Sequence, residues 1–496
     1  MRKKLFRAVL LLSILFYLFS CNLEPVLLLD NSGLTLNVRS QNKSIIIEWD
    51  IAYDEDLVGV NLSIYRVTEG EEELVEEHFI EDSSSYTFSA GKRGFYTIYV
   101  KGKNREGHYT EALRKQAFFF ITDLPIIYVD TPDGKGVTTK EYLKKTRGMS
   151  TFSIRNADFY NIYTQETDIK GRGNSTWTKM GDKKPYNLKL SNDIKPFGMG
   201  KSNKWILLAN AADRSLIRTE FVFTMANDIL SDVLAYTPSG RAVELVLDGD
   251  YRGTYQLVEQ KKVAKNRIDI DISAGEFLIE VEQIHDATDV GFETEKGIKI
   301  KLRDPEEEDE VDKIKGVIDA IEAFIYDEER EGLLEDKIDL DSFAAWYLVS
   351  ELTKNVDSNF KSSIYFHYKN GILYMGPLWD YDLSCGNWAG TFANPKGFLN
   401  QKAGWFEPLF KTTEFKGKVK ELWNAKRFGI KQHIDNIKEN SRYLNQAQQN
   451  NFSRWPHLSE TVFRNRVNTG SWEAEVDEVV NFLTARYAWM DAELNK

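Results

Sequence analysis

Residues 351–384 read ELTKNVDSNFKSSIYFHYKNGILYMGPLWDYDLS. The prediction of the fold starts from this stretch. It begins on the last turns of a predicted amphipathic helix over 339–355. Apolar and polar residues then alternate on both sides of Asn370-Gly371. An Asn-Gly pair between two such runs is a strong short-range signal for a β-hairpin, so we expect strands at 363–368 and 372–375.

Three acidic residues flank the predicted hairpin. Asp357 lies in the polar loop before it, close to Asn359, while Asp380 and then Asp382 follow it. Because a hairpin brings its outer ends together, we expect Asp357 and Asp380 to face each other across its mouth. Converging carboxylates beside an Asn suit phosphoryl transfer, in which one carboxylate orients the attacking hydroxyl and another holds Mg²⁺. The alternative is that Asp357 caps a helix or turn and that the other two acids are solvated loop residues.

Two upstream segments offer groups suited to phosphate. The segment 172–177, RGNSTW, is a Gly-flanked polar loop whose backbone N–H groups could cradle phosphate oxygens, with Arg172 adding charge. The segment 184–190, KPYNLKL, alternates as a strand, and Lys189 lies on the face opposite to its leucines. A lysine on the open face of a strand that follows a phosphate loop suits pairing with nucleotide phosphates. The alternatives are a plain turn and an exposed strand lysine.

These three segments, with KWILLANAADRSLIR at 204–218 and GDYRGTYQLVEQ at 249–260, resemble the CotH family of atypical, spore-coat-type protein kinases. The resemblance covers about residues 126–491, and the motifs occur in the family's order. It implies an α+β, two-lobed kinase-like domain that binds ATP and Mg²⁺, or Mn²⁺, between its lobes. It also implies that phosphate passes to Ser or Thr of a protein.

The resemblance implies roles for individual residues. Asp357 is expected to orient the acceptor hydroxyl as the catalytic residue, with Asn359 supporting it or the metal. The expected metal ligands are Asp380, Asp382 and Asn359. The residues expected to contact the nucleotide are Arg172, Asn174, Ser175, Lys189, Glu220 and Glu259.

Glu220 and Glu259 are candidates by position alone. A helix predicted over 216–230, with Asp213 as its N-cap, takes the place of the kinase helix whose acid pairs with the strand lysine. Glu259 begins the segment that corresponds to a kinase hinge, where backbone groups hold adenine. The chain departs from ordinary kinases at Ser362, which stands where they carry an Asn five residues after the catalytic Asp. We therefore expect Asn359 to substitute for that Asn, or the metal shell to differ.

Composition narrows the class of protein. The chain has 496 residues, 42% of them hydrophobic, which predicts a large core divided among two to four domains. The net charge of −12 argues against a nucleic-acid partner, because phosphate backbones are bound by clustered Lys and Arg.

The N-terminus has the pattern of a secretion signal. A basic start precedes the apolar run 8–19, which has the length of a signal-peptide core rather than of a membrane span. Leu18-Phe19-Ser20-Cys21 resembles a bacterial lipobox, so residues 1–20 are predicted to be a lipoprotein signal and Cys21 the lipidated residue. The alternatives are an uncleaved anchor or ordinary secretion. The second cysteine, Cys385, would then be unpaired, so a disulfide framework is not expected.

Residues 21–122 are predicted to form a separate all-β sandwich. Short alternating segments with turn residues between them indicate such a fold. Trp49 and the run 96–104 resemble the core Trp and a core strand of fibronectin type III modules, with Tyr96, Ile98 and Val100 pointing inward. The module is expected to act as a spacer. Residues 123–496 form the predicted kinase-like domain.

The sequence therefore predicts an exported protein kinase, tethered to the cell envelope by a lipid on Cys21, whose protein acceptor is not identified. A second hypothesis is a surface adhesin or assembly scaffold that keeps the CotH fold without catalysis. A third is glycan binding through aromatic residues after the second acidic loop, namely Trp388, Phe392 and Trp405.

Overall fold

The computed structural model describes residues 33–51, 56–141, 150–155, 164–282, 289–459, 466 and 468–496. The chain divides into two compact units, Met1–Phe120 and Ile121–Lys496. The predicted signal segment 1–20 and Cys21 lie outside the described residues. Within the described part of the chain, no helix has the length and apolar character that a membrane span requires.

The first unit contains two antiparallel sheets. One has the strand order β1-β2-β5 and the other β4-β3-β6-β7. The predicted inward residues of the long strand are buried, with Tyr96 at 2% exposure and Ile98 and Val100 at 0%, and Trp49 is also buried. The strands are β1 (Leu34–Gln41), β2 (Ser44–Ile51), β3 (Leu57–Thr68), β4 (Glu71–Ile80), β5 (Ser85–Phe88), β6 (Gly94–Asn104) and β7 (Leu113–Phe119).

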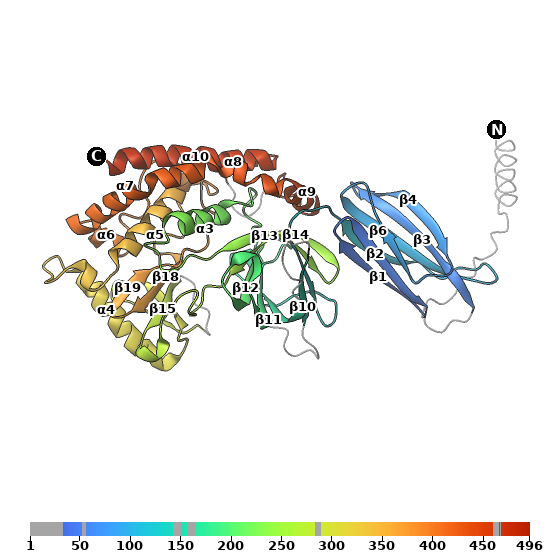
Figure 1. Cartoon of the computed structure of the whole chain (residues 1–496), viewed down its shortest axis with the longest axis horizontal. Helices are drawn as coiled ribbons and strands as arrows, with labels where there is room; N and C mark the ends of the chain where they lie inside the picture. Colours follow the sequence, from blue (N-terminus) through green and yellow to red (C-terminus); the bar gives the residue numbers. More distant parts are fainter. Residues whose placement is uncertain are drawn as a thin grey trace, which may run out of the picture. The chain divides into compact units, whose positions relative to one another are not determined.

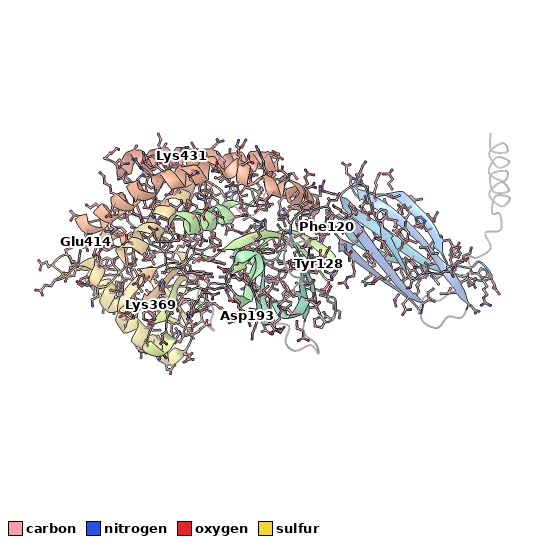
Figure 2. All side chains as sticks on the ribbon, viewed as in Figure 1. Phe120, Tyr128, Asp193, Lys369, Glu414 and Lys431 are labelled. Atoms are coloured by element: carbon pink, nitrogen blue, oxygen red, sulfur yellow. The ribbon has the colours of Figure 1, made fainter. Side chains whose placement is uncertain are left out.

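The second unit begins with a closed seven-stranded barrel in the order β10-β11-β12-β14-β13-β8-β9. Neighbouring strands are antiparallel except β8 and β13, which are parallel. Alternate residues of each strand fill the interior, among them Leu188, Trp205 and Leu257. The strands are β8 (Ile126–Asp130, which carries the Tyr128 labelled in Figure 2), β9 (Ser150–Arg155), β10 (Thr164–Gly171), β11 (Tyr186–Ile194), β12 (Ser202–Leu208), β13 (Gly240–Leu247) and β14 (Asp250–Glu259).

A five-stranded sheet follows the barrel, in the order β16-β17-β15-β18-β19. Its last two strands form the predicted hairpin, whose turn pairs Lys369 with Ile372. Asn370 and Gly371 both have positive φ, 53° and 86°, the conformation that an Asn-Gly turn provides. The strands are β15 (Phe277–Glu282), β16 (Gly291–Glu293), β17 (Lys299–Asp304), β18 (Ser362–Lys369) and β19 (Ile372–Met375).

Helices pack around this sheet and form the larger of the two cores in the unit. Figure 1 shows α7 and α10 running alongside each other, and both contact α5. The helices are α2 (Ser175–Thr178), α3 (Arg218–Ile229), α4 (Val311–Tyr326), α5 (Leu340–Thr353), α6 (Phe406–Leu409), α7 (Thr413–Asp435), α8 (Ile437–Asn440), α9 (Asn445–Arg454) and α10 (Trp472–Leu494).

Two details of the predicted helices are corrected. The prediction that α5 is amphipathic is wrong, because all of its residues from Ser342 to Thr353 are buried between α7, α10 and β19. The N-cap of α3 is Ile217 rather than Asp213. Asp213 still stabilises the start of this helix, because its Oδ2 accepts a hydrogen bond from the backbone N of Arg218 at 2.8 Å.

Candidate active site

The hairpin mouth brings three carboxylates into mutual range. The pKa of Asp357 is raised by burial and by the charge of Asp380, against the opposing charge of Lys361. The pKa of Asp382 is raised well above its ordinary value by burial, and Asp380, Asp213 and Asp357 add to the rise. Asp357 and Asp382 therefore lie within electrostatic range of Asp380 at the mouth of the hairpin.

Local backbone geometry holds Asp380 in place. Its φ is +67°, in the left-handed region that Asp tolerates better than most residues. The side chain of Asn355 donates to the backbone O of Asp380 at 3.1 Å, and the hydroxyl of Ser363 donates to its Oδ2 at 3.1 Å. Both contacts come from the segment that runs from the end of α5 into the start of β18, so the opposite side of the hairpin mouth holds the backbone and the carboxylate of Asp380. Its side chain remains exposed.

Asp357 lies at the other side of the mouth. Its Oδ1 is 3.0 Å from Nζ of Lys361, which is half-exposed. Its backbone N donates to the side chain of Asn355 at 3.3 Å, so one amide side chain contacts the backbone of both acidic segments. Asn359 is exposed on the same loop. The Asn355 bridge links the positions of the two aspartates.

Two cations from the barrel end face these acids. Arg172 continues β10, and burial lowers its pKa while Asp380, Tyr365, Glu280 and Asp382 oppose that effect. Its guanidinium carbon lies 5.6 Å from the ring centroid of Trp379. Arg172 therefore lies within electrostatic range of the hairpin carboxylates, and its contact with a nucleotide stays a prediction.

Lys261 is the second cation, and it follows β14. Its Nζ lies 4.2 Å from the ring centroid of Trp379 and 4.5 Å from that of Tyr365. Burial lowers its pKa to about 7, with Glu280 as the strongest opposing charge. Glu280 on β15 in turn pairs with Arg303 on β17. The site thus contains side chains of opposite charge, and its cations lie against aromatic side chains.

Asn174, Ser175 and Lys189, three more of the predicted nucleotide-binding residues, lie on other parts of the barrel and its loops. Asn174 is the N-cap residue of α2, and its Oδ1 accepts a hydrogen bond from Lys140 at 3.2 Å, while Ser175 begins the helix. Lys189 lies on the outer face of β11, opposite Asp168 on β10 and Lys204 on β12. Its position is four residues beyond Pro185, whose backbone O bonds to the N of Arg172. At ~3.3 Å per strand residue, that places Lys189 about 13 Å farther along the barrel than Arg172.

The expected pair of Lys189 and Glu220 is replaced by another contact. Glu220 accepts a hydrogen bond from the hydroxyl of Tyr443 and faces Arg241, and burial raises its pKa. No interaction between Glu220 and Lys189 occurs among the described residues. The first turn of α3 points this acid toward the segment that leads into α9, which the helical pattern alone did not reveal.

The carboxylate of Glu259 is engaged in hydrogen bonds within the protein. Its carboxylate accepts hydrogen bonds from Gly200 N at 2.6 Å, from the Tyr236 hydroxyl at 3.1 Å and from Ser239 N at 3.1 Å. Its own backbone N donates to Ser239 O at 3.0 Å. Glu259 therefore ties the end of β14 to two loops, and its contact with a nucleotide stays a prediction.

Sequence reasoning missed several members of the site. The alternation of β18 could have placed Tyr365 on the face that receives Lys261, but nothing in the sequence paired β15 with β18. The two strands pair Glu280 with Tyr365 directly. Long-range strand pairing of this kind is not encoded in local patterns, so Lys261, Glu280, Arg303, Tyr365 and Trp379 become visible as one cluster only in the fold.

The carboxylate and amide oxygens at the hairpin mouth suit a hard divalent cation, but they do not form a complete set of metal ligands. Within the described ranges, no three His, Cys, Asp or Glu side chains converge tightly enough to hold a metal by themselves. Mg²⁺ is commonly held by one or two carboxylates together with phosphate oxygens and water. Asp380 and Asp382, with an exposed Asn359 nearby, fit that partial ligand set.

A family model described as CotH kinase protein matches residues 169–490, which is more than half of the chain. No curated protein matches.

Two solved structures illustrate the similarity to known folds. A structure titled "Myokine structure" is 16% identical, with a TM-score of 0.14, covering 17% of this chain and 89% of that one. A twitchin kinase region from C. elegans is 9% identical, with a TM-score of 0.17, covering 45% of this chain and 39% of that one. Neither TM-score is high enough to support an inference about fold.

Proposed function

The chain belongs to the CotH kinase protein family, and on that premise we propose that it is an atypical protein kinase that transfers the γ-phosphate of ATP to Ser or Thr of a protein. The observation that carries this proposal is that the side chain of Asn355 contacts the backbone of both Asp357 and Asp380, with Asp382 two residues beyond. Arg172 and Lys261 approach the same acids from the barrel. Carboxylates for a metal and an acceptor, opposed by cations for phosphate, are the groups that phosphoryl transfer requires.

The proposal assigns a role to each group. Asp357 orients the acceptor hydroxyl and accepts its proton, and burial favours this because it raises the proton affinity of the carboxylate. Asp380 and Asp382, with Asn359, hold Mg²⁺, which when bound neutralises charge on the phosphates. Arg172, with Asn174 and Ser175 of its loop, holds one part of the nucleotide, and Lys189, about 13 Å farther along the barrel, holds another. The barrel and the sheet with its helices then act as the two lobes of a kinase-like domain.

Lys261 adds a group that family-based reasoning did not name. Its ammonium lies against Trp379 and within electrostatic range of Glu280. A phosphate group entering beside Arg172 would offer it a second anionic partner. We therefore include Lys261 among the cations that neutralise the transferred phosphate.

We propose an envelope location from the N-terminal sequence. The basic start, the short apolar run and Cys21 have the pattern of a lipoprotein signal, so the mature protein would be anchored through lipid on Cys21. Metabolic labelling with a fatty acid tests this, since Cys21→Ser should abolish incorporation and release the protein from membranes. Retention of label in Cys21→Ser would remove the proposal.

We further propose that the first unit is a fibronectin type III-like module. Its two sheets, β1-β2-β5 and β4-β3-β6-β7, and its buried Trp49 and Tyr96 support that assignment. The module would separate the catalytic unit from the membrane.

A phosphotransfer assay tests the catalytic proposal. The chain is incubated with γ-labelled ATP and Mg²⁺ or Mn²⁺ beside Asp357→Asn and Asp380→Asn, and label in protein is measured. We expect transfer in the wild type and a loss of at least about 100-fold in each variant. Absence of transfer in the wild type, with nucleotide binding that does not depend on Asp380, would favour the adhesin or scaffold instead.

A further inference from the structure

A buried lysine outside the carboxylate cluster has no acceptor for its ammonium. Lys183 lies in the connection between α2 and β11, and it is 1% exposed. Among the described residues its Nζ has neither a hydrogen-bond acceptor nor an ion-pair partner. It lies 5.3 Å from the ring centroid of Tyr255, which contributes to the barrel interior. A buried ammonium with no acceptor oxygen is costly, because its three donors lose water without replacement.

The nearest carboxylates do not supply the missing acceptor. Asp213 and Glu244 act on Lys183 through their charge only. Asp213 is engaged by Arg218 and Ser215. The carboxylate of Glu244 accepts hydrogen bonds from Tyr251 at 2.8 Å, Thr254 at 3.1 Å and Asn450 at 3.2 Å. Both acids are therefore already satisfied by other donors.

Two further basic side chains lie within electrostatic range of Lys183 and come from different segments. The pKa of His457, which follows α9, is lowered to about 4 by burial and by the charges of Lys183 and Arg214. Arg214 precedes α3 and is 1% exposed, with its NH1 3.6 Å from Glu475. Burial also lowers the pKa of Lys183 to about 7. Lys183, Arg214 and His457 therefore lie within electrostatic range of one another. Among the described residues, Arg214 is the one of the three that pairs directly with an acid.

We propose that Lys183, Arg214 and His457 form a binding site for a phosphate group. Three segments far apart in sequence converge on this site, and the ammonium of Lys183 is the donor that lacks an acceptor. A phosphate dianion offers several acceptor oxygens at once, so it could bond to Lys183 and to Arg214 together. It would also favour the protonated form of His457, and so create a third charge-assisted contact. The site is built from residues other than the three carboxylates, and its binding of phosphate does not depend on the proposed kinase activity.

Thermal unfolding of the full chain in inorganic phosphate tests this site. Melting is compared in phosphate and in chloride at equal ionic strength, without metal or nucleotide. A ligand that binds only the folded state at about ten times its Kd should raise the Tm by roughly 2 °C. We expect that rise in the wild type and none in Lys183→Met. Lys183→Met should also melt higher than the wild type in chloride, because it removes a buried charge that has no acceptor.

A matched substitution controls for charge. Lys420 is an exposed lysine on α7, and Lys420→Met makes the same change in net charge. It should keep the full phosphate-dependent rise. Equal rises in Lys183→Met and the wild type, or no specific rise in the wild type, would overturn the proposal. If Lys183→Met does not fold, phosphate titration followed by the NMR signals of His457 replaces the melting test, and unchanged signals would overturn it.

Two further arms separate the source of the phosphate group from the proposed catalysis. If metal-free ADP competes with inorganic phosphate at this site, the nucleotide supplies the group, whereas independent binding identifies a free or protein-linked phosphate. Asp380→Asn should retain phosphate binding although it loses transfer. Absence of transfer in the wild type, with phosphate binding intact, would therefore count against the kinase proposal alone.

Discussion

At the scale of single residues, both the backbone conformation and the charge of Asp380 contribute to the candidate site. Its backbone is left-handed, Asn355 donates to its backbone O, and Ser363 donates to its carboxylate. An alanine at this position would change the backbone preference as well as the charge, whereas Asn tolerates the same conformation. Asn is therefore the substitution that isolates the carboxylate charge.

We expect Asp380→Asn to abolish metal-dependent transfer while leaving the fold at least as stable. The reason is that Asp380 raises the pKa of both Asp357 and Asp382, so its charge is unfavourable to its neighbours. The measurements are phosphotransfer and Tm for the same preparation. A variant that loses activity and also melts several degrees lower would show that Asp380 is structural, contrary to this account.

His367 gives a pH prediction at the residue scale. It lies on β18, is 7% exposed and stacks on Tyr374 with ring centroids 5.0 Å apart. Burial lowers its pKa from 6.5 to about 4, so the unfolded chain binds this proton more readily than the folded protein. Its contribution to stability is therefore present above pH 6.5 and is lost as pH falls toward 4, by up to about 3 kcal/mol.

Replacing this histidine removes that dependence. In His367→Phe the free energy of unfolding should fall less steeply between pH 6.5 and 4 than in the wild type, as measured by denaturant titration. Asp and Glu side chains titrate in both proteins, so the difference between the two curves isolates His367. Parallel curves over this range would contradict the assignment.

At the scale of elements, α5 and α10 are joined by a buried ion pair. Arg486 on α10 donates to the carboxylate of Glu351 on α5 at 2.6 Å, and both side chains have 0% exposure. Arg486 also donates to the backbone O of Pro395 and Gly397, while Glu351 accepts from the backbone N of Leu399 and Asn400. The pair thus holds residues 395–400 against the end of α5. These residues follow the loop of Asp380 and Asp382, and α5 leads into the loop of Asp357.

Removing one partner should be more damaging than removing both. Arg486→Met leaves Glu351 buried without its cation, and we expect a loss of about 3–5 kcal/mol in the free energy of unfolding. The double variant Glu351→Gln/Arg486→Met should recover part of that loss. Chemical denaturation of the two single variants and the double variant measures it. Additive losses would mean that the two side chains do not act as a pair.

The hairpin could be predicted from sequence because its information is local. The Asn-Gly turn and the alternating residues around it define the strands of β18 and β19, and with them the meeting of Asp357 and Asp380. The burial of α5 could not be predicted, because it depends on helices that come much later in the chain. Lys261 and Glu220 were missed or misplaced for the same reason, since their partners lie on distant elements.

At the scale of the whole molecule, every member of the candidate site belongs to the second unit. Arg172 comes from the barrel, and Asp357, Glu280 and Trp379 come from the sheet and its loops, all beyond Phe120. The first unit forms two sheets with their own buried residues. Catalysis should therefore not require it.

We expect a chain of residues 121–496 to retain phosphotransfer within about twofold of the full chain when a soluble acceptor is used. Circular dichroism and Tm would establish that it folds. The full chain serves as the reference at equal molar concentration. A folded but inactive second unit would mean that the first unit contributes to the site or to acceptor binding.

The measurement that tests the central claim most directly is isothermal titration calorimetry of a non-hydrolysable ATP analogue. The titrations are made with and without Mg²⁺, on the wild type and on Asp380→Asn. If the carboxylates and the barrel cations form one metal–nucleotide site, Mg²⁺ should strengthen binding at least about tenfold in the wild type and have little effect in the variant. Equal affinities in all four titrations, or no binding in any, would contradict the account.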